Sequence, residues 1–109
     1  MEWYERAMAM FPRATCIVFT DDKEWCYENF GPTEVVVDTP SHHHDLAIMA
    51  QCDAHIISAS SFSWWGAWLA EARSGFDGSN KVIAPEPWYA SDWRTSDGIV
   101  PDRWTTLAV

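Results

Sequence analysis

The sequence predicts an α/β fold, a Rossmann-like parallel sheet with helices on both faces. Short apolar runs alternate with segments of helical periodicity along the 109 residues. These runs are apolar throughout and do not alternate with polar residues, which is typical of strands buried in a parallel sheet. No linker or internal repeat divides the chain, so we expect residues 1–109 to form a single domain.

Four helices are expected. In the first, over residues 2–10, Trp3, Ala7 and Met10 recur at helical spacing, and Pro12 ends it. The second covers about residues 23–29 and is followed by a turn at Gly31-Pro32. Asp45 caps or opens the third. Its apolar face is formed by Leu46, Ile48, Met49 and Cys52. The fourth covers about residues 62–73.

Four strands separate these helices, because each is a short run rich in β-branched and apolar residues. They cover residues 16–20, 34–38, 55–59 and 81–84. Pro85 and Pro87 are expected to stop the last strand, since proline lacks the N–H that a strand ladder uses. The tail to Val109 has no clean periodicity, and we expect it to be irregular, with room for one helical turn.

The composition excludes several classes of function. Sixteen acidic and seven basic residues give a net charge of −9, which does not suit a nucleic-acid binder or an anionic membrane surface. No apolar run is long enough for a transmembrane helix, and the acidic start does not resemble a signal peptide. Three scattered cysteines favour reduced thiols in a cytosolic compartment.

Three consecutive histidines raise the question of a metal site. His42, His43 and His44 lie in an expected loop, where neighbouring imidazoles rarely converge on one ion, and no fourth ligand accompanies them. We therefore expect a solvated loop beside Asp45 and no metal. Contact of this loop with a sugar or a base is the alternative.

The segment SSFSWWGAWL, residues 60–69, is the most unusual in the chain. A strand ends, two hydroxyls follow and a helix begins, and the free N–H groups of a helix start suit a phosphate. Trp64 and Trp68 pair four residues apart, and Gly66 with Ala70 forms a small face for close approach to the sheet. The alternative from spacing alone is an ordinary N-cap followed by a Trp-rich core helix.

Nearly the whole chain resembles the C-terminal half of the α-1,2-fucosyltransferases, glycosyltransferase family 11. The motif DLxxM at residues 45–49, Cys52 and HII at 55–57 lead into the specific SSFSWWGAWL run. The flanking segments FTDDxxW at 19–25, VIAPxxW at 82–88 and IVPxxW at 99–104 are similar to steps of that family, in the same order.

The resemblance implies the C-terminal lobe of a GT-B glycosyltransferase that binds GDP-fucose and transfers fucose to a galactoside 2-hydroxyl, with inversion and without metal or other cofactor. It implies that the Asp45 carboxylate accepts hydrogen bonds from the N1–H and N2–H₂ donors on the edge of guanine. It implies that the hydroxyls of Ser60 and Ser61, with the amides from Phe62 onward, hold the diphosphate. Asp21 and Asp22 would order the ribose or the fucose.

One departure from the family concerns the arginine that neutralises the leaving diphosphate, since no His-x-Arg-x-Gly-Asp-like motif is present. The acceptor-binding N-terminal lobe is also missing. We therefore expect donor binding without turnover by this chain alone, and assign it no catalytic residue. A bacterial-type cytoplasm beside a membrane glycan pathway is the expected compartment, or the Golgi in a eukaryote.

Two other classes stay open at this stage. A receiver domain shares the acidic pair after the first strand and a Ser after a later one, but its last strand ends in Lys-Pro, whereas this one ends in Ala84-Pro85. A non-catalytic remnant or partner-docking domain would use the eight Trp as an exposed patch. A receiver domain would take up phosphate in a magnesium-dependent reaction, whereas a donor lobe would not.

Overall fold

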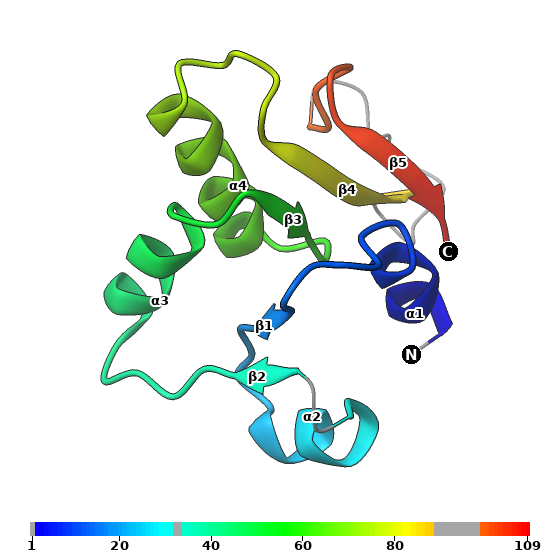
Figure 1. Cartoon of the computed structure of the whole chain (residues 1–109), viewed down its shortest axis with the longest axis vertical. Coiled ribbons are helices and arrows are strands. Elements are labelled where there is room, and N and C mark those ends of the chain that lie inside the picture. Colours follow the sequence, from blue (N-terminus) through cyan, green and yellow to red (C-terminus); the bar gives the residue numbers. More distant parts are fainter. Residues whose placement is uncertain (1, 32–33, 89–98) are drawn as a thin grey trace. The chain divides into compact units, whose positions relative to one another are not determined.

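The computed structural model describes residues 2–31, 34–88 and 99–109. In chain order the elements are α1 (Glu2–Met8), β1 (Ile17–Val18), α2 (Lys23–Asn29), β2 (Val35–Val36), α3 (His42–Met49), β3 (Ala54–Ile56), α4 (Ser61–Arg73), β4 (Lys81–Glu86) and β5 (Thr105–Ala108) (Figure 1). All three strand pairs are parallel, which confirms the predicted Rossmann-like α/β class. Pro32, Trp93 and Arg94 lie outside the described residues.

The chain divides into two compact units, Met1–Asp45 and Leu46–Val109, and α3 runs from one into the other. The first unit holds the parallel pair β1–β2, with Ile17 opposite Val35. The second holds a parallel sheet of order β3-β4-β5. Helix α4 belongs to this second unit and packs on its sheet through Ala67, which shares one apolar cluster with Val82 and Ala84.

Strand β4 is the central strand of the second unit and continues through Pro85, where the sequence predicted its end. The hydrogen-bonding direction explains the difference. The Ile83 carbonyl accepts from the Ile57 N–H, and the Glu86 carbonyl accepts from the Val109 N–H. Alternate residues of β4 therefore bond to β3 and to β5, and the nitrogen of Pro85 points to the β3 side, beyond the last residue of β3.

Strand β5 corrects the expectation of an irregular tail. Thr105 pairs with Ile83 and Ala108 with Glu86, although only Leu107 of this strand is even half-buried. No apolar run marks it in the sequence, because it is an edge strand whose pairing depends on tertiary contacts. The buried Trp104 immediately before it supplies these contacts.

Helix α3 begins at His42, so the expected histidine loop is its first turn. Ser41 explains the earlier start, because its carbonyl accepts from the N–H groups of His44 and Asp45, at 3.1 and 3.2 Å. Its Oγ also lies 3.4 Å from the His44 N–H and 2.7 Å from His44 Nδ1. Ser41 therefore caps α3, and Asp45 lies within its first turn instead of at its cap.

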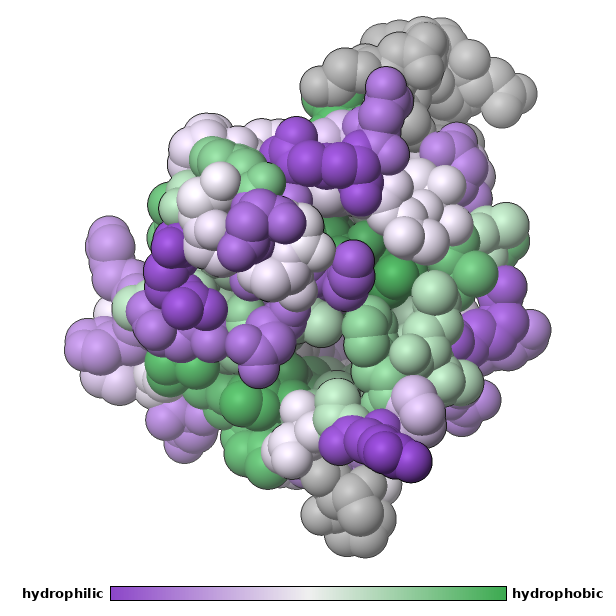
Figure 2. Space-filling model, turned by 45° about the horizontal axis from the view of Figure 1, so that its top comes forward, coloured by the Kyte–Doolittle hydropathy of each residue, from purple (hydrophilic) through white to green (hydrophobic). Residues whose placement is uncertain are grey.

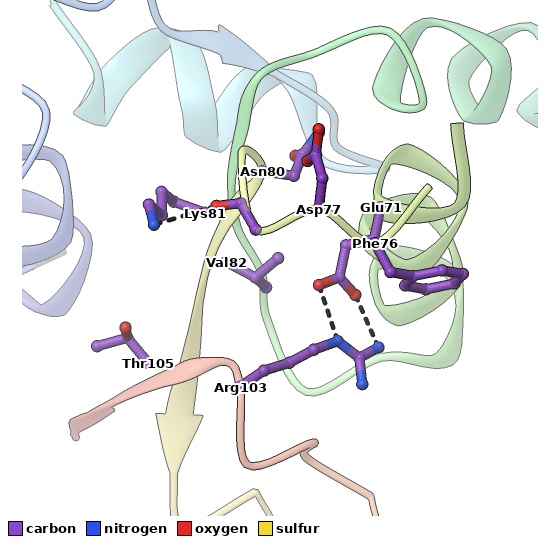
Figure 3. A pocket seen from close by; sticks show the side chains of 9 residues that line it. Glu71, Phe76, Asp77, Asn80, Lys81, Val82, Arg103 and Thr105 are labelled. Carbon is purple, nitrogen blue, oxygen red and sulfur yellow. Dashed lines mark hydrogen bonds and ion pairs between the residues drawn. The ribbon is translucent and has the colours of Figure 1, made fainter. Parts of the chain in front are cut away.

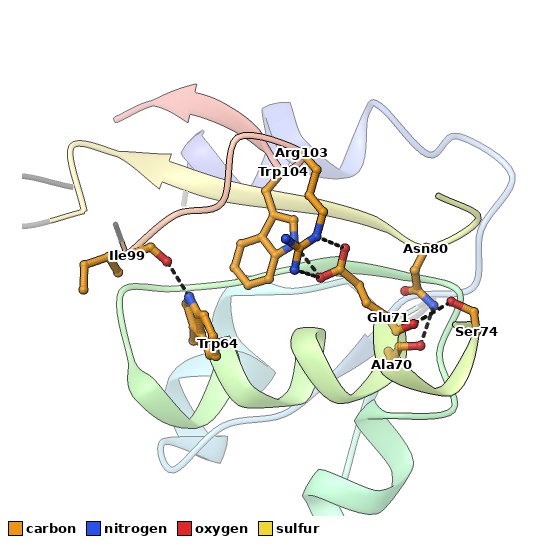
Figure 4. Close-up of polar contacts among 8 residues, drawn as sticks. All are labelled: Trp64, Ala70, Glu71, Ser74, Asn80, Ile99, Arg103 and Trp104. Atoms are coloured by element: carbon orange, nitrogen blue, oxygen red, sulfur yellow. Dashed lines mark hydrogen bonds and ion pairs between the residues drawn. The ribbon is translucent and has the colours of Figure 1, made fainter. Parts of the chain in front are cut away.

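A buried carboxylate joins α4 to the segment before β5 (Figure 4). Glu71 is 5% exposed and lies in the last turns of α4. Arg103 donates to both of its oxygens, each at 2.9 Å, and Trp104 Nε1 donates to Oε1 at 2.8 Å. These bonds raise the pKa of Arg103. Three donors offset the desolvation of the charge and fix the approach of the chain to β5.

Aromatic rings extend this contact along α4. Trp64 packs at 5.5 Å from the Trp104 ring and donates from Nε1 to the Ile99 carbonyl at 2.6 Å. Trp68 lies edge-on to Trp65 and to Phe76, at 5.5 and 5.4 Å between centroids. The predicted Trp-rich core helix is therefore present, although Trp65 remains 49% exposed.

Gly66 serves a different contact from the one that its spacing predicted. A Cβ at this position would lie 2.5 Å from Met49 Cε and 3.2 Å from Met49 Cβ. The missing side chain thus admits the last residue of α3, whereas Ala67 is the small residue that faces the sheet. His55 secures the same junction, because its Nε2 lies 2.6 Å from the Met49 carbonyl.

The first unit has a smaller core, in which Ala7 and Cys26 are buried. Tyr4 and Trp25 both lie edge-on to Phe30, at 6.2 and 6.1 Å between centroids. All three cysteines of the chain are free thiols, as expected.

Apolar residues also reach the surface between polar ones (Figure 2). The larger of these include Tyr27, Val35, Trp65 and Phe76.

Replacing Glu71 with Gln is expected to lower the free energy of unfolding by about 1–3 kcal/mol, because the amide group faces Arg103 with donors and the charge is lost. Urea denaturation followed by far-UV circular dichroism measures the change. Glu86→Gln, an exposed carboxylate on β4, is the matched control and should stay within about 0.5 kcal/mol of the wild type. Equal losses in the two variants would contradict the structural role of Glu71.

The buried His55 predicts a stability that falls with acid. Burial lowers the pKa of His55 below its ordinary 6.5, and the hydrogen bond to Met49 opposes this only in part. The unfolded chain then binds more protons, so His55 costs no stability above pH 6.5 and destabilises the fold as the pH falls from there toward the folded pKa.

Thermal unfolding between pH 7.5 and 5.5 tests this prediction. The wild type should lose more stability over this range than His55→Gln, whose amide also donates to Met49 but does not titrate. His43→Gln, on the exposed side of α3, should keep the wild-type pH dependence. A wild-type minus His55→Gln difference that is constant with pH would rule the idea out.

Candidate functional site

The carboxyl ends of β1 and β2 meet at one edge, and a hollow of about 330 Å³ opens there in the first unit. Thr20 and Asp21 follow β1, whereas Thr39 to His42 follow β2 and enter α3. The residues that line the hollow are Thr20, Asp21, Lys23, Val37, Thr39, Pro40, Ser41, His42 and Asp45. Two of the predicted site residues, Asp21 and Asp45, therefore belong to the same hollow.

Asp45 is the more enclosed of these two carboxylates. It is half-buried in the first turn of α3, and its Oδ1 accepts a hydrogen bond from Thr39 Oγ1. Within residues 2–31, 34–88 and 99–109, its Oδ2 has no hydrogen-bond donor. The start of the helix favours a negative charge at this place. Asp45 thus presents one open acceptor oxygen from a fixed position.

The remaining charges of the hollow lie nearer the solvent. Asp21 Oδ1 is 3.8 Å from His42 Nε2, and both side chains are largely exposed. Lys23 Nζ is 2.5 Å from Asp38 Oδ1, a bond that raises the pKa of Lys23 and lowers the pKa of Asp38. Two carboxylates and several hydroxyls line the hollow, and its one ammonium, that of Lys23, is already paired with Asp38. The hollow therefore suits a ligand rich in hydrogen-bond donors.

Asp22 does not line this hollow in the structure. Its side chain accepts from the Trp25 N–H at 3.1 Å and caps α2, whereas its own N–H donates to Thr20 Oγ1 at 2.9 Å. The sequence predicted a ligand contact for Asp22 and did not predict this cap. The cap fixes the turn that carries Asp21.

In the second unit, the turn after β3 leads into α4 through the predicted residues Ser60, Ser61 and Phe62. Ser60 is the N-cap, because its Oγ accepts from the Ser63 N–H at 3.2 Å. The Ser63 hydroxyl, which has one proton, lies within reach of the carbonyls of Ser58 and Ser60, at 2.9 and 3.1 Å. The N-cap alternative is confirmed for Ser60, and Ser63 is a member of this turn that the sequence analysis passed over.

Ser61 is the exposed first residue of α4. Among the described residues, its hydroxyl has no hydrogen-bond partner. Helix α4 has 13 residues, so its N-terminal N–H groups and its dipole add to the attraction for an anion. Ser61 therefore presents a hydroxyl that is available to a ligand, whereas the Ser60 hydroxyl is used within the protein.

A second hollow, also of about 330 Å³, lies at the opposite, amino edge of β4 and β5 (Figure 3). Its charged groups bond to one another or to the local backbone: Arg103 to Glu71, Lys81 Nζ to the Gly78 carbonyl, and Asp77 to the Ser79 N–H. Ligands of parallel α/β sheets bind at the carboxyl ends of the strands. We therefore assign this second hollow to the scaffold of the second unit.

The structure also bears on metals and membranes. Across the described part of the chain, no three His, Cys, Asp or Glu side chains form a group that could hold a metal ion. His42, His43 and His44 lie in one helical turn, and each is exposed. No helix among the described residues is both long and apolar enough to cross a membrane.

Comparison with known proteins agrees with the resemblance read from the motifs. The family model described as glycosyl transferase family 11 matches residues 1–108. An alpha-1,2-colitosyltransferase of Escherichia coli is 35% identical over 103 residues, which cover 89% of this chain and 34% of that protein. The O-antigen biosynthesis glycosyltransferase WbnK of Escherichia coli is 29% identical over an alignment of 116 positions, which covers 98% of this chain and 36% of that protein.

The chain spans about a third of the length of these curated relatives. No solved structure matches it significantly. The family match nevertheless extends across both units, including the hollow after β1 and β2 and the turn before α4. The chain belongs to glycosyl transferase family 11.

Proposed function

We propose that the chain binds the donor of an α-1,2-fucosyltransferase-type glycosyltransferase, with GDP-fucose as the nucleotide sugar and a galactoside as the acceptor. The observation that carries the proposal is the Asp45 carboxylate, held at the carboxyl edge of β1 and β2 with one oxygen open. The name of the colitosyltransferase relative supports the α-1,2 linkage. In the reaction, the 2-hydroxyl of galactose attacks the anomeric carbon of fucose and GDP leaves with inversion.

The role of the first unit is to recognise the nucleoside. Guanine presents an N1–H and an N2–H₂ on adjacent atoms, and a carboxylate accepts from both. Adenine offers a lone pair at N1, which a carboxylate repels. Asp45 therefore selects guanine over adenine, and Asp21 with the neighbouring hydroxyls accepts from the hydroxyls of ribose or fucose.

The role of the second unit is to bind phosphate at the start of α4. The Ser61 hydroxyl and the backbone amides at the helix start, Phe62 included, donate to the diphosphate, and Ser60 holds the turn in shape by accepting from the Ser63 N–H. No metal is required in this proposal, because helix amides and hydroxyls supply the donors. Asp22 contributes by capping α2 beside Asp21.

We propose that turnover also needs groups beyond those that the described residues present. Arg73 donates to the carbonyls of Ala50 and Gln51, and Arg103 is bonded to Glu71. Both guanidinium groups are thus used in the scaffold. We propose that the cation facing the leaving diphosphate, and the acceptor contacts, belong to the two-thirds of the relatives' length that this chain does not span.

Binding of a nucleotide series tests the role of Asp45. The wild-type chain should bind GDP and GDP-fucose more tightly than ADP or UDP, as measured by calorimetry or Trp fluorescence. Asp45→Asn should weaken GDP by about 10-fold or more and remove most of the preference over ADP, because one acceptor oxygen becomes an amide donor. Asp53→Asn, a change of an exposed carboxylate that does not line the hollow, is the matched control. Preserved discrimination in a folded Asp45→Asn chain would end the guanine assignment.

A second variant separates phosphate from base recognition. Ser61→Ala should weaken GDP by about 3- to 10-fold and leave guanosine unchanged, because only GDP carries phosphates. Ser79→Ala, in the loop at the amino edge of β4, should change neither. Equal weakening of GDP and guanosine by Ser61→Ala would indicate damage to the fold instead of a lost phosphate contact.

A further inference from the structure

We propose that Thr39 is a positioning residue, which sets the orientation of the Asp45 carboxylate and thereby the preference for guanine. The inference rests on the proposed function and deepens it. It starts from one contact inside the first unit, the hydrogen bond between Thr39 Oγ1 and Asp45 Oδ1.

The Thr39 hydroxyl has a single proton and two acceptors within reach. One is Asp45 Oδ1, and the other is the Ser41 carbonyl oxygen at 3.0 Å. The Ser41 carbonyl already accepts from the N–H groups of His44 and Asp45. A carboxylate is also the stronger acceptor, because the hydrogen bond is assisted by its charge. The proton of Thr39 therefore goes to Asp45.

The backbone holds both ends of this contact. The Val37 N–H donates to the Val18 carbonyl at 2.9 Å, which keeps the chain in register with β1 two residues before Thr39. At the other end, the Ser41 cap fixes the first turn of α3, which carries Asp45. Thr39 therefore links two anchored segments and restrains the rotation of the Asp45 side chain about its terminal bond.

This restraint matters for a base that offers two adjacent donors. A carboxylate that turns freely must be ordered when guanine binds, whereas one that is already oriented avoids this cost. Thr39 occupies one lone pair of Oδ1, so its second lone pair and the open Oδ2 remain for the two guanine donors. Thr39 thus contributes to selectivity without touching the base.

Two substitutions at Thr39 test the inference by calorimetry with GDP, ADP and inosine diphosphate, which lacks the 2-amino group. Thr39→Val keeps the shape of the side chain and removes the donor. It should weaken GDP by about 3- to 10-fold and narrow its advantage over inosine diphosphate. Thr39→Ser keeps the hydroxyl and should stay within about twofold of the wild type.

The same Thr39→Val change in an Asp45→Ala chain distinguishes positioning from general damage. With no carboxylate to orient, Thr39→Val should cause no further loss of GDP affinity, whereas a damaged hollow would lose affinity in both backgrounds. Full GDP selectivity in a Thr39→Val single variant, with Asp45→Ala still defective, would overturn this inference alone. A wild-type chain that does not prefer GDP to ADP would overturn the proposed function and this inference with it.

Discussion

The second unit depends on one buried carboxylate. Glu71 brings together α4, Arg103 and Trp104, and these last two residues stand directly before the edge strand β5. A buried charge is costly unless its lone pairs are filled, so the three donors must all be in place when the chain folds. These bonds fix the position of the chain before β5. Strand β5 therefore has one register on β4, although its own residues bury little apolar surface.

The two edges of the parallel sheets have separate tasks. At the amino edge of β4 and β5, charged side chains bond to each other and consolidate the scaffold. At the carboxyl edges, in each unit, hydroxyls and carboxylates follow the strands and begin helices. The same residues that cap a helix there also shape the loop that a ligand would meet. By our proposal, this chain recognises the donor at its carboxyl edges, and substitutions in the scaffold at the amino edge should leave nucleotide selectivity intact.

The sequence was sufficient for the α/β class, for the order of the helices and for the span of α2, because these depend on local periodicity. It failed for β5, whose pairing comes from Trp104 and Glu71 and not from an apolar pattern. It also placed the start of α3 too late, since the cap is Ser41 and a run of histidines hid the helical turn. Motif matching predicted Asp21, Asp22, Asp45, Ser60 and Ser61 alike as donor contacts, and only the structure shows that the side chains of Asp22 and Ser60 cap helices.

The proline within β4 has a consequence for the strand beside it. In a parallel ladder, the next bond after the one from Ile57 to Ile83 would run from the N–H of residue 85 to the Ile57 carbonyl. Pro85 has no such hydrogen, so the segment that follows β3 leaves the sheet after Ile57. It then turns at Ser58, whose carbonyl accepts from Ser60 and Ser63. The Pro85 ring on β4 thereby sets where the loop after β3 begins. Pro85→Ala would permit a longer β3 at the expense of the serine turn.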